Sequence, residues 1–83
     1  MKLILFGTAA CHLCELAQEL LRDSLTHLPA IQLQVIDIAE ETQWQDRYAV
    51  RIPVLWHPES QRELGWPFDK IAVLTFIDEL KND

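Results

Sequence analysis

Apolar residues near the start of the chain change from a continuous run to a helical spacing. The run from Leu3 to Phe6 predicts a buried strand over residues 2–6, which Gly7 ends. Apolar residues then recur three and four positions apart, and this spacing predicts a helix from about Leu13. The stripe consists of Leu13, Leu16, Ala17, Leu20, Leu21 and Leu28. Pro29 should end the helix, because a residue before proline leaves the helical region.

Two further elements are predicted in the middle of the chain. Residues 31–35 alternate between apolar side chains and glutamine, which is typical of a strand with one face in water. The apolar pattern continues to Ile38, so the far end of this strand should be more deeply buried. A shorter helix should follow over residues 41–48, with Trp44 and Tyr48 one turn apart on one face.

The last third of the chain predicts a pair of strands and a final helix. Residues 51–66 contain two strand-like segments around a turn at residues 57–60. Asp69 is a suitable N-cap for the final helix, and Phe68 and Val73 are spaced to form a hydrophobic staple. The residues expected on the inner face of this helix are Ile71, Leu74, Ile77 and Leu80.

The order of these elements is β-α-β-α-β-β-α, within one domain that spans residues 1–83. A helical crossover favours a parallel arrangement of the first two strands, and a short turn makes the last pair antiparallel. The predicted fold class is therefore α/β, with a four-stranded mixed sheet and helices packed on it. The chain of 83 residues is too short for two independent cores, but its 49% of hydrophobic residues can bury one.

The charge of the chain argues against two classes of partner. A formal net charge of −6 disfavours sequence-independent binding to nucleic acid phosphates and docking on an anionic membrane surface. The apolar run near the N-terminus is shorter than the core of a secretion signal, which has roughly 7–15 residues. No segment approaches the roughly 20 apolar residues that span a bilayer. We therefore expect a cytoplasmic protein that binds neither nucleic acid nor membrane. We also expect it to be a monomer.

The two cysteines of the chain, Cys11 and Cys14, are separated by two residues at the predicted start of the first long helix. Unpaired backbone N–H groups and the positive end of the helix dipole should lower the pKa of the Cys11 thiol. His12, when protonated, would add positive charge. Cys14 lies on the same helical face and within disulfide range. Cys11 is thus expected to attack a disulfide, and Cys14 to resolve the mixed disulfide that forms.

Other interpretations of the cysteine pair stay open at this point. A structural zinc site needs four ligands, of which this pair supplies two, and the three histidines lack the usual ligand spacing. A metal or iron–sulfur binder would have to borrow ligands from a second copy or from glutathione. The cysteines could instead be inert, or could sense oxidation in a binding or adaptor domain without enzymatic activity. We expect no bound metal or organic cofactor.

Four segments resemble those of the small bacterial glutaredoxin-like proteins, which have the thioredoxin fold. The segments are CHLCELA at 11–17, VIDI at 35–38, YAVRIPVL at 48–55 and ELGWPFD at 63–69. The resemblance implies a thiol–disulfide oxidoreductase with Cys11 as nucleophile and Cys14 as resolving thiol. It also implies that the Ile52–Pro53 peptide bond is cis and lies opposite the cysteines. Backbone groups of Ile52 would then pair with an extended peptide or with glutathione.

The chain departs from typical dithiol glutaredoxins between the cysteines and at a glycine pair that approaches glutathione in that family. His12 and Leu13 stand where those proteins carry Pro-Tyr, and residues 65–67 (Gly-Trp-Pro) stand where they carry a Gly-Gly pair. Arg51 is a candidate substitute contact for a substrate carboxylate. The expected substrates are protein disulfides or glutathione mixed disulfides, with glutathione or another dithiol protein as the reductant. The residues expected to bind substrate are His12, Arg51, Ile52, Pro53, Gly65 and Trp66.

Overall fold

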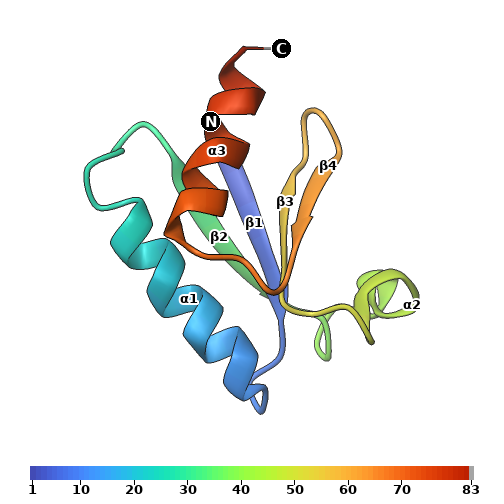
Figure 1. Cartoon of the computed structure of the whole chain (residues 1–83). Coiled ribbons are helices and arrows are strands. Elements are labelled where there is room, and N and C mark those ends of the chain that lie inside the picture. The colour runs from blue at the N-terminus through green and yellow to red at the C-terminus, as the bar shows by residue number, and fades with distance from the viewer. Residues whose placement is uncertain (83) are drawn as a thin grey trace.

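Four strands form one mixed sheet in the computed structural model, which describes residues 1–82 (Figure 1). The strands are β1 (Lys2–Gly7), β2 (Gln32–Asp37), β3 (Val54–His57) and β4 (Arg62–Gly65). Their spatial order is β2-β1-β3-β4. β1 runs parallel to β2 and antiparallel to β3, and β3 runs antiparallel to β4. The predicted strand directions are therefore confirmed.

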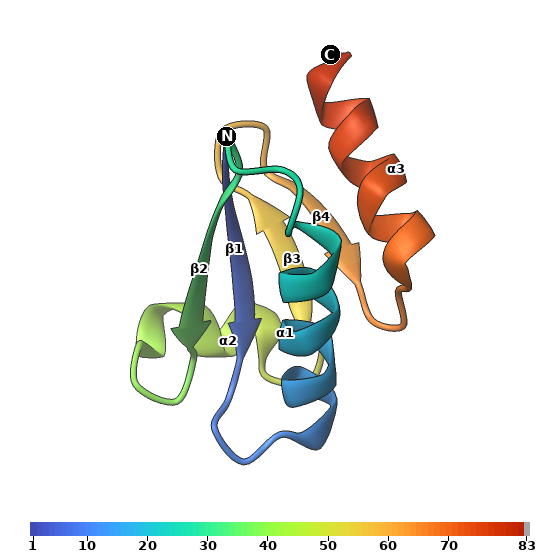
Figure 2. The same cartoon turned by 90° about the vertical axis from the view of Figure 1, so that its left-hand side faces the viewer.

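Helices cover both faces of this sheet. α1 (His12–Ser24) and α3 (Lys70–Lys81) pack on one face (Figure 2). On the other face, the 3₁₀ turn η1 (Thr42–Trp44) leads into α2 (Gln45–Tyr48), a helix of a single turn. Within residues 1–82, no helix has both the length and the apolar character needed to cross a membrane.

β1 is the centre of the core because its side chains are buried on both faces. Leu3 and Leu5 belong to the hydrophobic cluster under α1 and α3, whereas Ile4 and Phe6 belong to the cluster under α2. The Phe6 ring lies 4.3 Å from the ring of Tyr48, centroid to centroid, and the two rings stack. Burial on both faces explains why β1 is a continuous apolar run instead of an alternating one.

The prediction that α1 extends to Leu28 is wrong, because the helix ends at Ser24. The Ser24 hydroxyl donates to the Leu20 carbonyl at 2.7 Å, and the Thr26 hydroxyl donates to the Arg22 carbonyl at 2.9 Å. The Thr26 hydroxyl satisfies one of the last four carbonyl groups of the helix, and the Ser24 hydroxyl competes with the backbone for the Leu20 carbonyl, so the helix can end before Pro29 forces it to. Leu28 still packs against the core, but from a turn.

The inner face of α3 was also predicted incorrectly at two positions. Ile71 is 75% exposed and Leu74 is 38% exposed. The buried residues of this helix are Val73, Phe76, Ile77 and Leu80. Positions three apart drift around a helix by roughly 60° at each step, so a set spaced only by threes cannot stay on one face. The N-cap was predicted correctly, since Asp69 Oδ1 accepts the Ala72 N–H at 2.8 Å.

Candidate active site

α1 begins close to the end of the sheet at which β1 stops (Figure 2). Cys11 immediately precedes this helix, and Cys14 lies in its first turn. Cys11 is the N-cap of the helix, and its Sγ accepts a hydrogen bond from the backbone N–H of Cys14 at 3.1 Å. The two Cα atoms are 5.1 Å apart, and the two sulfurs are joined as a disulfide. Cys14 is only 6% exposed, whereas Cys11 is half-buried. The pair therefore has one more accessible and one more protected sulfur.

The helix start gives the Cys11 sulfur a fixed source of positive potential. The first intrahelical bond runs from the Glu15 N–H to the Cys11 carbonyl at 3.1 Å, so the N–H groups of this turn point toward the N-cap. A hydrogen bond from an N–H group and the positive end of the helix dipole both favour a thiolate when the pair is reduced. His12 is exposed, and its Nδ1 lies 3.8 Å from a carboxylate oxygen of Glu15.

Gly7, the last residue of β1, makes room for the second cysteine. A Cβ atom placed on Gly7 would lie 3.0 Å from both Cβ and Sγ of Cys14. Such a distance is well inside ordinary van der Waals contact, so a larger residue at position 7 would push against the disulfide. From the sequence, Gly7 was interpreted only as the end of a strand.

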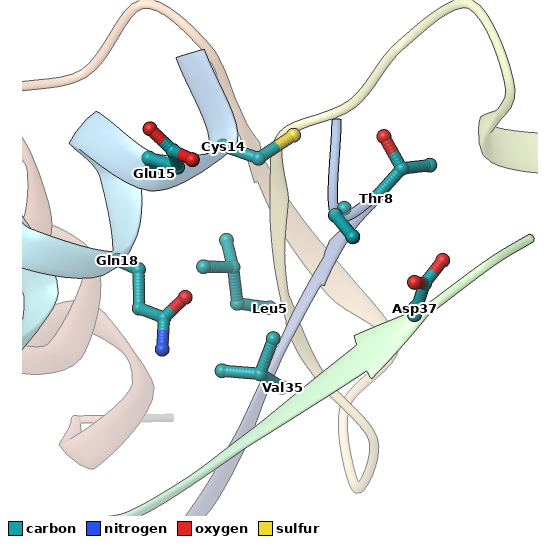
Figure 3. A pocket seen from close by; sticks show the side chains of 9 residues that line it. Leu5, Thr8, Cys14, Glu15, Gln18, Val35 and Asp37 are labelled. Carbon is teal, nitrogen blue, oxygen red and sulfur yellow. The ribbon is translucent and has the colours of Figure 1, made fainter. Parts of the chain in front are cut away.

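A pocket of about 280 Å³ opens beside Cys14 (Figure 3). Glu15 and Gln18 of α1 line one side of it, and Thr8 and Asp37 line the other. The apolar lining residues include Leu5 and Val35. Val35 is 46% exposed, so the predicted alternation of buried apolar residues and exposed glutamines does not hold at the centre of β2. Ile36 and Ile38 are buried, as expected for the far end of this strand.

The register between β1 and β3 places Pro53 at the end of the sheet where β1 leads toward the cysteine pair. Phe6 pairs with Val54 in this antiparallel ladder, so the next step along the two strands brings Gly7 opposite Pro53. Pro53 is fully buried, Ile52 is half-buried, and the peptide bond between them is cis. The Ile52 N–H donates to the Tyr48 carbonyl at 3.1 Å. Of the two Ile52 backbone groups expected to meet substrate, this N–H already has a partner.

Gly65 and Trp66 lie at the end of β4, beside the same segment. Gly65 pairs with Val54, and the Trp66 N–H donates to the Pro53 carbonyl at 3.3 Å. The Trp66 side chain is half-buried and meets the Phe68 ring edge-on, with the centroids 5.0 Å apart. The structure thus brings the cysteines, Ile52–Pro53 and the end of β4 to one end of the sheet.

Comparison with known proteins agrees with this geometry. The family described as "Glutaredoxin-like domain (DUF836)" matches residues 2–78. The chain belongs to this glutaredoxin-like family. No functionally curated protein matches it.

Solved structures of similar proteins confirm the predicted thioredoxin-like fold of this glutaredoxin-like domain. The X-ray structure of XcR50 from X. campestris matches with a TM-score of 0.75 at 32% identity, over 93% of this chain and 96% of that one. The solution structure of Ne2328 from Nitrosomonas europaea has a TM-score of 0.73 at 29% identity, over 90% of this chain and 88% of that one. Thioredoxin 1 from Thermosipho africanus has a TM-score of 0.74 over the full length of both chains. Because its identity is only 19%, this last match shows the fold alone.

Arg51 of the glutaredoxin-like domain lies in a cluster centred on Glu63. The Arg51 guanidinium donates to Glu63 Oε1, and the Tyr48 hydroxyl donates to Glu63 Oε2 at 2.6 Å. Arg47 Nη2 lies 3.2 Å from Glu63 Oε2. The guanidinium groups of Arg47 and Arg51 also lie within 5.3 Å of the centre of the Tyr48 ring. A substrate carboxylate would therefore meet an Arg51 that already has an anionic partner.

The pKa values of this cluster follow from its contacts. Burial of Glu63 acts to raise the pKa of its carboxyl, but hydrogen bonds from Arg51 and Tyr48 and the charges of the two arginines outweigh it, so the pKa is lowered. Burial, and then the hydrogen bond to Glu63, raise the pKa of Tyr48 to about 12. Glu63 is thus an anion and Tyr48 a neutral donor at neutral pH.

Several of these residues carried no recognisable signal in the sequence. Glu63 and Tyr48 are 15 positions apart on different elements, and only the packing of α2 against the sheet brings them together. Asp37 and Gln18 line the pocket from β2 and α1. Within residues 1–82, no three His, Cys, Asp or Glu side chains are grouped so that they could hold a metal ion.

Proposed function

We propose that this glutaredoxin-like protein is a thiol–disulfide oxidoreductase that acts through Cys11 and Cys14. The observation that carries the proposal is the position of the Cys11 sulfur. It caps α1, accepts the Cys14 N–H at 3.1 Å and is bonded to the Cys14 sulfur. Such a sulfur is a better thiolate than one in bulk solvent, and its resolving partner is within reach. Membership of the glutaredoxin-like family supports the same chemistry.

The reaction moves two electrons from the protein to a substrate disulfide. The Cys11 thiolate attacks one substrate sulfur, forms a mixed disulfide and releases the other substrate sulfur as a thiolate, which takes up a proton from solvent. Cys14 loses its proton to solvent and attacks the Cys11 sulfur. The second substrate sulfur then leaves as a thiolate, and the Cys11–Cys14 disulfide closes. Two molecules of glutathione, which leave as oxidised glutathione, or one dithiol protein return the two electrons, as a reducing cytoplasm would allow.

We infer that the substrate backbone binds along Ile52–Pro53. The Ile52 carbonyl would accept a hydrogen bond from an extended peptide or from glutathione, as in the addition of a strand. Gly65 and Trp66 would border this groove, and His12 would lie beside the attacked disulfide. Arg51 has N–H groups beyond the one that contacts Glu63, and these would bind a substrate carboxylate.

A turnover assay with cysteine variants tests this function. Wild type, Cys11→Ser and Cys14→Ser would each be offered a glutathione mixed disulfide and a protein disulfide in parallel. We expect Cys11→Ser to abolish both activities, and Cys14→Ser to trap a covalent complex with the protein substrate. Ala10→Ser, which places a serine at an exposed neighbouring position, is the matched control and should keep wild-type activity. Full activity of Cys11→Ser, or no turnover by wild type on either substrate, would refute the assignment.

A further inference from the structure

Glu63 connects β4 to the segment that precedes Pro53. Its side chain is only 19% exposed, and both of its carboxylate oxygens are engaged. Tyr48 and Arg51 donate hydrogen bonds to it, and Arg47 forms an ion pair with it. Three side chains from one short stretch of chain therefore converge on a single acid in β4.

This stretch has little local structure of its own. α2 is one turn long, and isolated helices shorter than about 12 residues are marginal in water. Val50 follows with 98% of its surface exposed, so it adds no buried contact. Tyr48 is the buried anchor, with 0% of its surface exposed and its ring stacked on Phe6. The position of the segment is thus determined by the buried Tyr48 ring and by the contacts of Tyr48, Arg47 and Arg51 with Glu63.

Backbone hydrogen bonds carry the position of Tyr48 to the proposed groove. The Tyr48 carbonyl accepts the N–H of Arg51 at 2.9 Å and the N–H of Ile52 at 3.1 Å. At the other end, the Trp66 N–H holds the Pro53 carbonyl. Residues 51–53 are therefore held at one end through Tyr48, which is bound to Glu63 of β4, and at the other end by Trp66, which follows β4.

We propose that Glu63 is a positioning residue for disulfide exchange. Its carboxylate fixes Tyr48 and Arg51, and through them it fixes the backbone of Ile52 and Pro53 in the orientation that receives an extended substrate. The inference rests on the proposed function, because it assigns Glu63 to the same groove. Glu63 contacts no reacting sulfur, so its effect is on substrate binding and leaves the reactivity of Cys11 unchanged.

Steady-state kinetics of Glu63→Gln and Tyr48→Phe test the proposal on a protein disulfide. Each variant keeps the shape of its side chain and removes part of the charge-assisted hydrogen bonding. We expect KM to rise about tenfold with kcat changed by less than about twofold, because a lost hydrogen bond to a charged group is worth roughly that much. The rate at which iodoacetamide alkylates reduced Cys11 should stay within about twofold of wild type in both variants.

Glu59→Gln is the matched control for the loss of one negative charge. Glu59 is exposed in the turn between β3 and β4, at the end of the sheet away from α1's first turn (Figure 1). Its variant should have wild-type KM and kcat. An unchanged KM in both Glu63→Gln and Tyr48→Phe would overturn the proposal, as would an equal rise of KM in Glu59→Gln.

Amide hydrogen exchange separates this inference from the proposed function, because it needs no turnover. In Glu63→Gln and in Tyr48→Phe, the amides of Arg51 and Ile52 should exchange about tenfold faster, while that of Leu5 in β1 should not change. Faster exchange in a protein that turns over no disulfide would uphold the role of Glu63 in fixing the backbone of residues 51–53 and would reject the oxidoreductase. Unchanged exchange at Arg51 and Ile52, or equal acceleration at Leu5, would reject the positioning role itself.

Discussion

At the scale of single residues, the cysteine pair depends on a neighbour that has no reactive group. An added Cβ on Gly7 would lie 3.0 Å from Cys14, whereas nothing lies within 4 Å of an added Cβ on Gly65. Neither glycine has a positive φ, so the requirement at position 7 is for space and not for an unusual backbone conformation. Gly65 can therefore serve as a control for Gly7, because an added methyl group has free space at position 65 but not at position 7.

Alanine substitutions at these glycines should therefore differ in their effect on stability. Gly7→Ala overpacks the site of Cys14 and should lower the free energy of unfolding by about 1–3 kcal/mol. Gly65→Ala should change it by less than about 1 kcal/mol and can even raise it, because alanine restricts the unfolded chain. Urea unfolding of the oxidised proteins measures both values. Equal stability of the two variants would mean that the Cys14 site tolerates a methyl group.

At the scale of elements, α1 and α3 begin with the same hydrogen-bond arrangement but different chemistry. Asp69 Oδ1 accepts the N–H of Ala72 at 2.8 Å, and Cys11 Sγ accepts the N–H of Cys14 at 3.1 Å. A position that favours an anion stabilises the fold when aspartate occupies it. Occupied by cysteine, the same position favours the thiolate that disulfide exchange requires.

The cap of α3 should contribute measurably to stability. Asp69→Ala removes the acceptor of the Ala72 N–H and should lower the free energy of unfolding by about 1 kcal/mol. Asp78→Ala is the control on the same helix, because an acid near the C-terminus is disfavoured by the helix dipole and its loss should not destabilise. Urea unfolding of both variants tests this, and a similar loss for Asp78→Ala would argue against capping as the cause.

The sequence predicts those elements whose signals are local. The continuous apolar run of β1 and the N-cap Asp69 are set by neighbours along the chain, so they could be identified before the structure was known. The end of α1 and the buried face of α3 depend on turn hydrogen bonds and on the angle at which a helix meets the sheet. The spacing of apolar residues alone does not determine where the helix ends or which face is buried. For this reason the helix was wrongly predicted to reach Leu28, and Ile71 was wrongly predicted to be buried.

At the scale of the whole molecule, the site is assembled from residues far apart in the chain. The two cysteines could be found by their spacing, but Gly7 against Cys14 and Glu63 against Tyr48 are contacts between different elements. Such contacts depend on sheet order and register, which no local pattern contains. The Glu63 cluster joins α2 to β4, so it should influence the stability of the fold as well as the proposed groove.

The pH dependence of stability should reveal this cluster at the acid end. Because the pKa of Glu63 is lowered in the folded protein, its contribution is complete above the ordinary carboxyl value of about 4.3. The contribution is lost as the pH falls through the lower folded value, where protonation removes the anion that Arg51 and Tyr48 bind. Glu63→Gln should lack this part of the acid destabilisation, which urea unfolding at a series of pH values measures.

Tyr48 should produce the opposite dependence at the alkaline end. Its pKa rises to about 12 on folding, so the folded state is favoured fully below the ordinary value of about 10 and progressively less up to pH 12. The loss at pH 12 should be on the order of 2 kcal/mol, and it should be absent from Tyr48→Phe. Subtracting the variant from wild type removes the titration of lysines, and use of the oxidised protein removes that of the cysteines. Ionising the Tyr48 hydroxyl would place two negative charges in contact, because the hydroxyl is bound to an ionised Glu63. If the difference in the free energy of unfolding between wild type and Tyr48→Phe stayed constant from pH 9 to about 12, this arrangement would be contradicted.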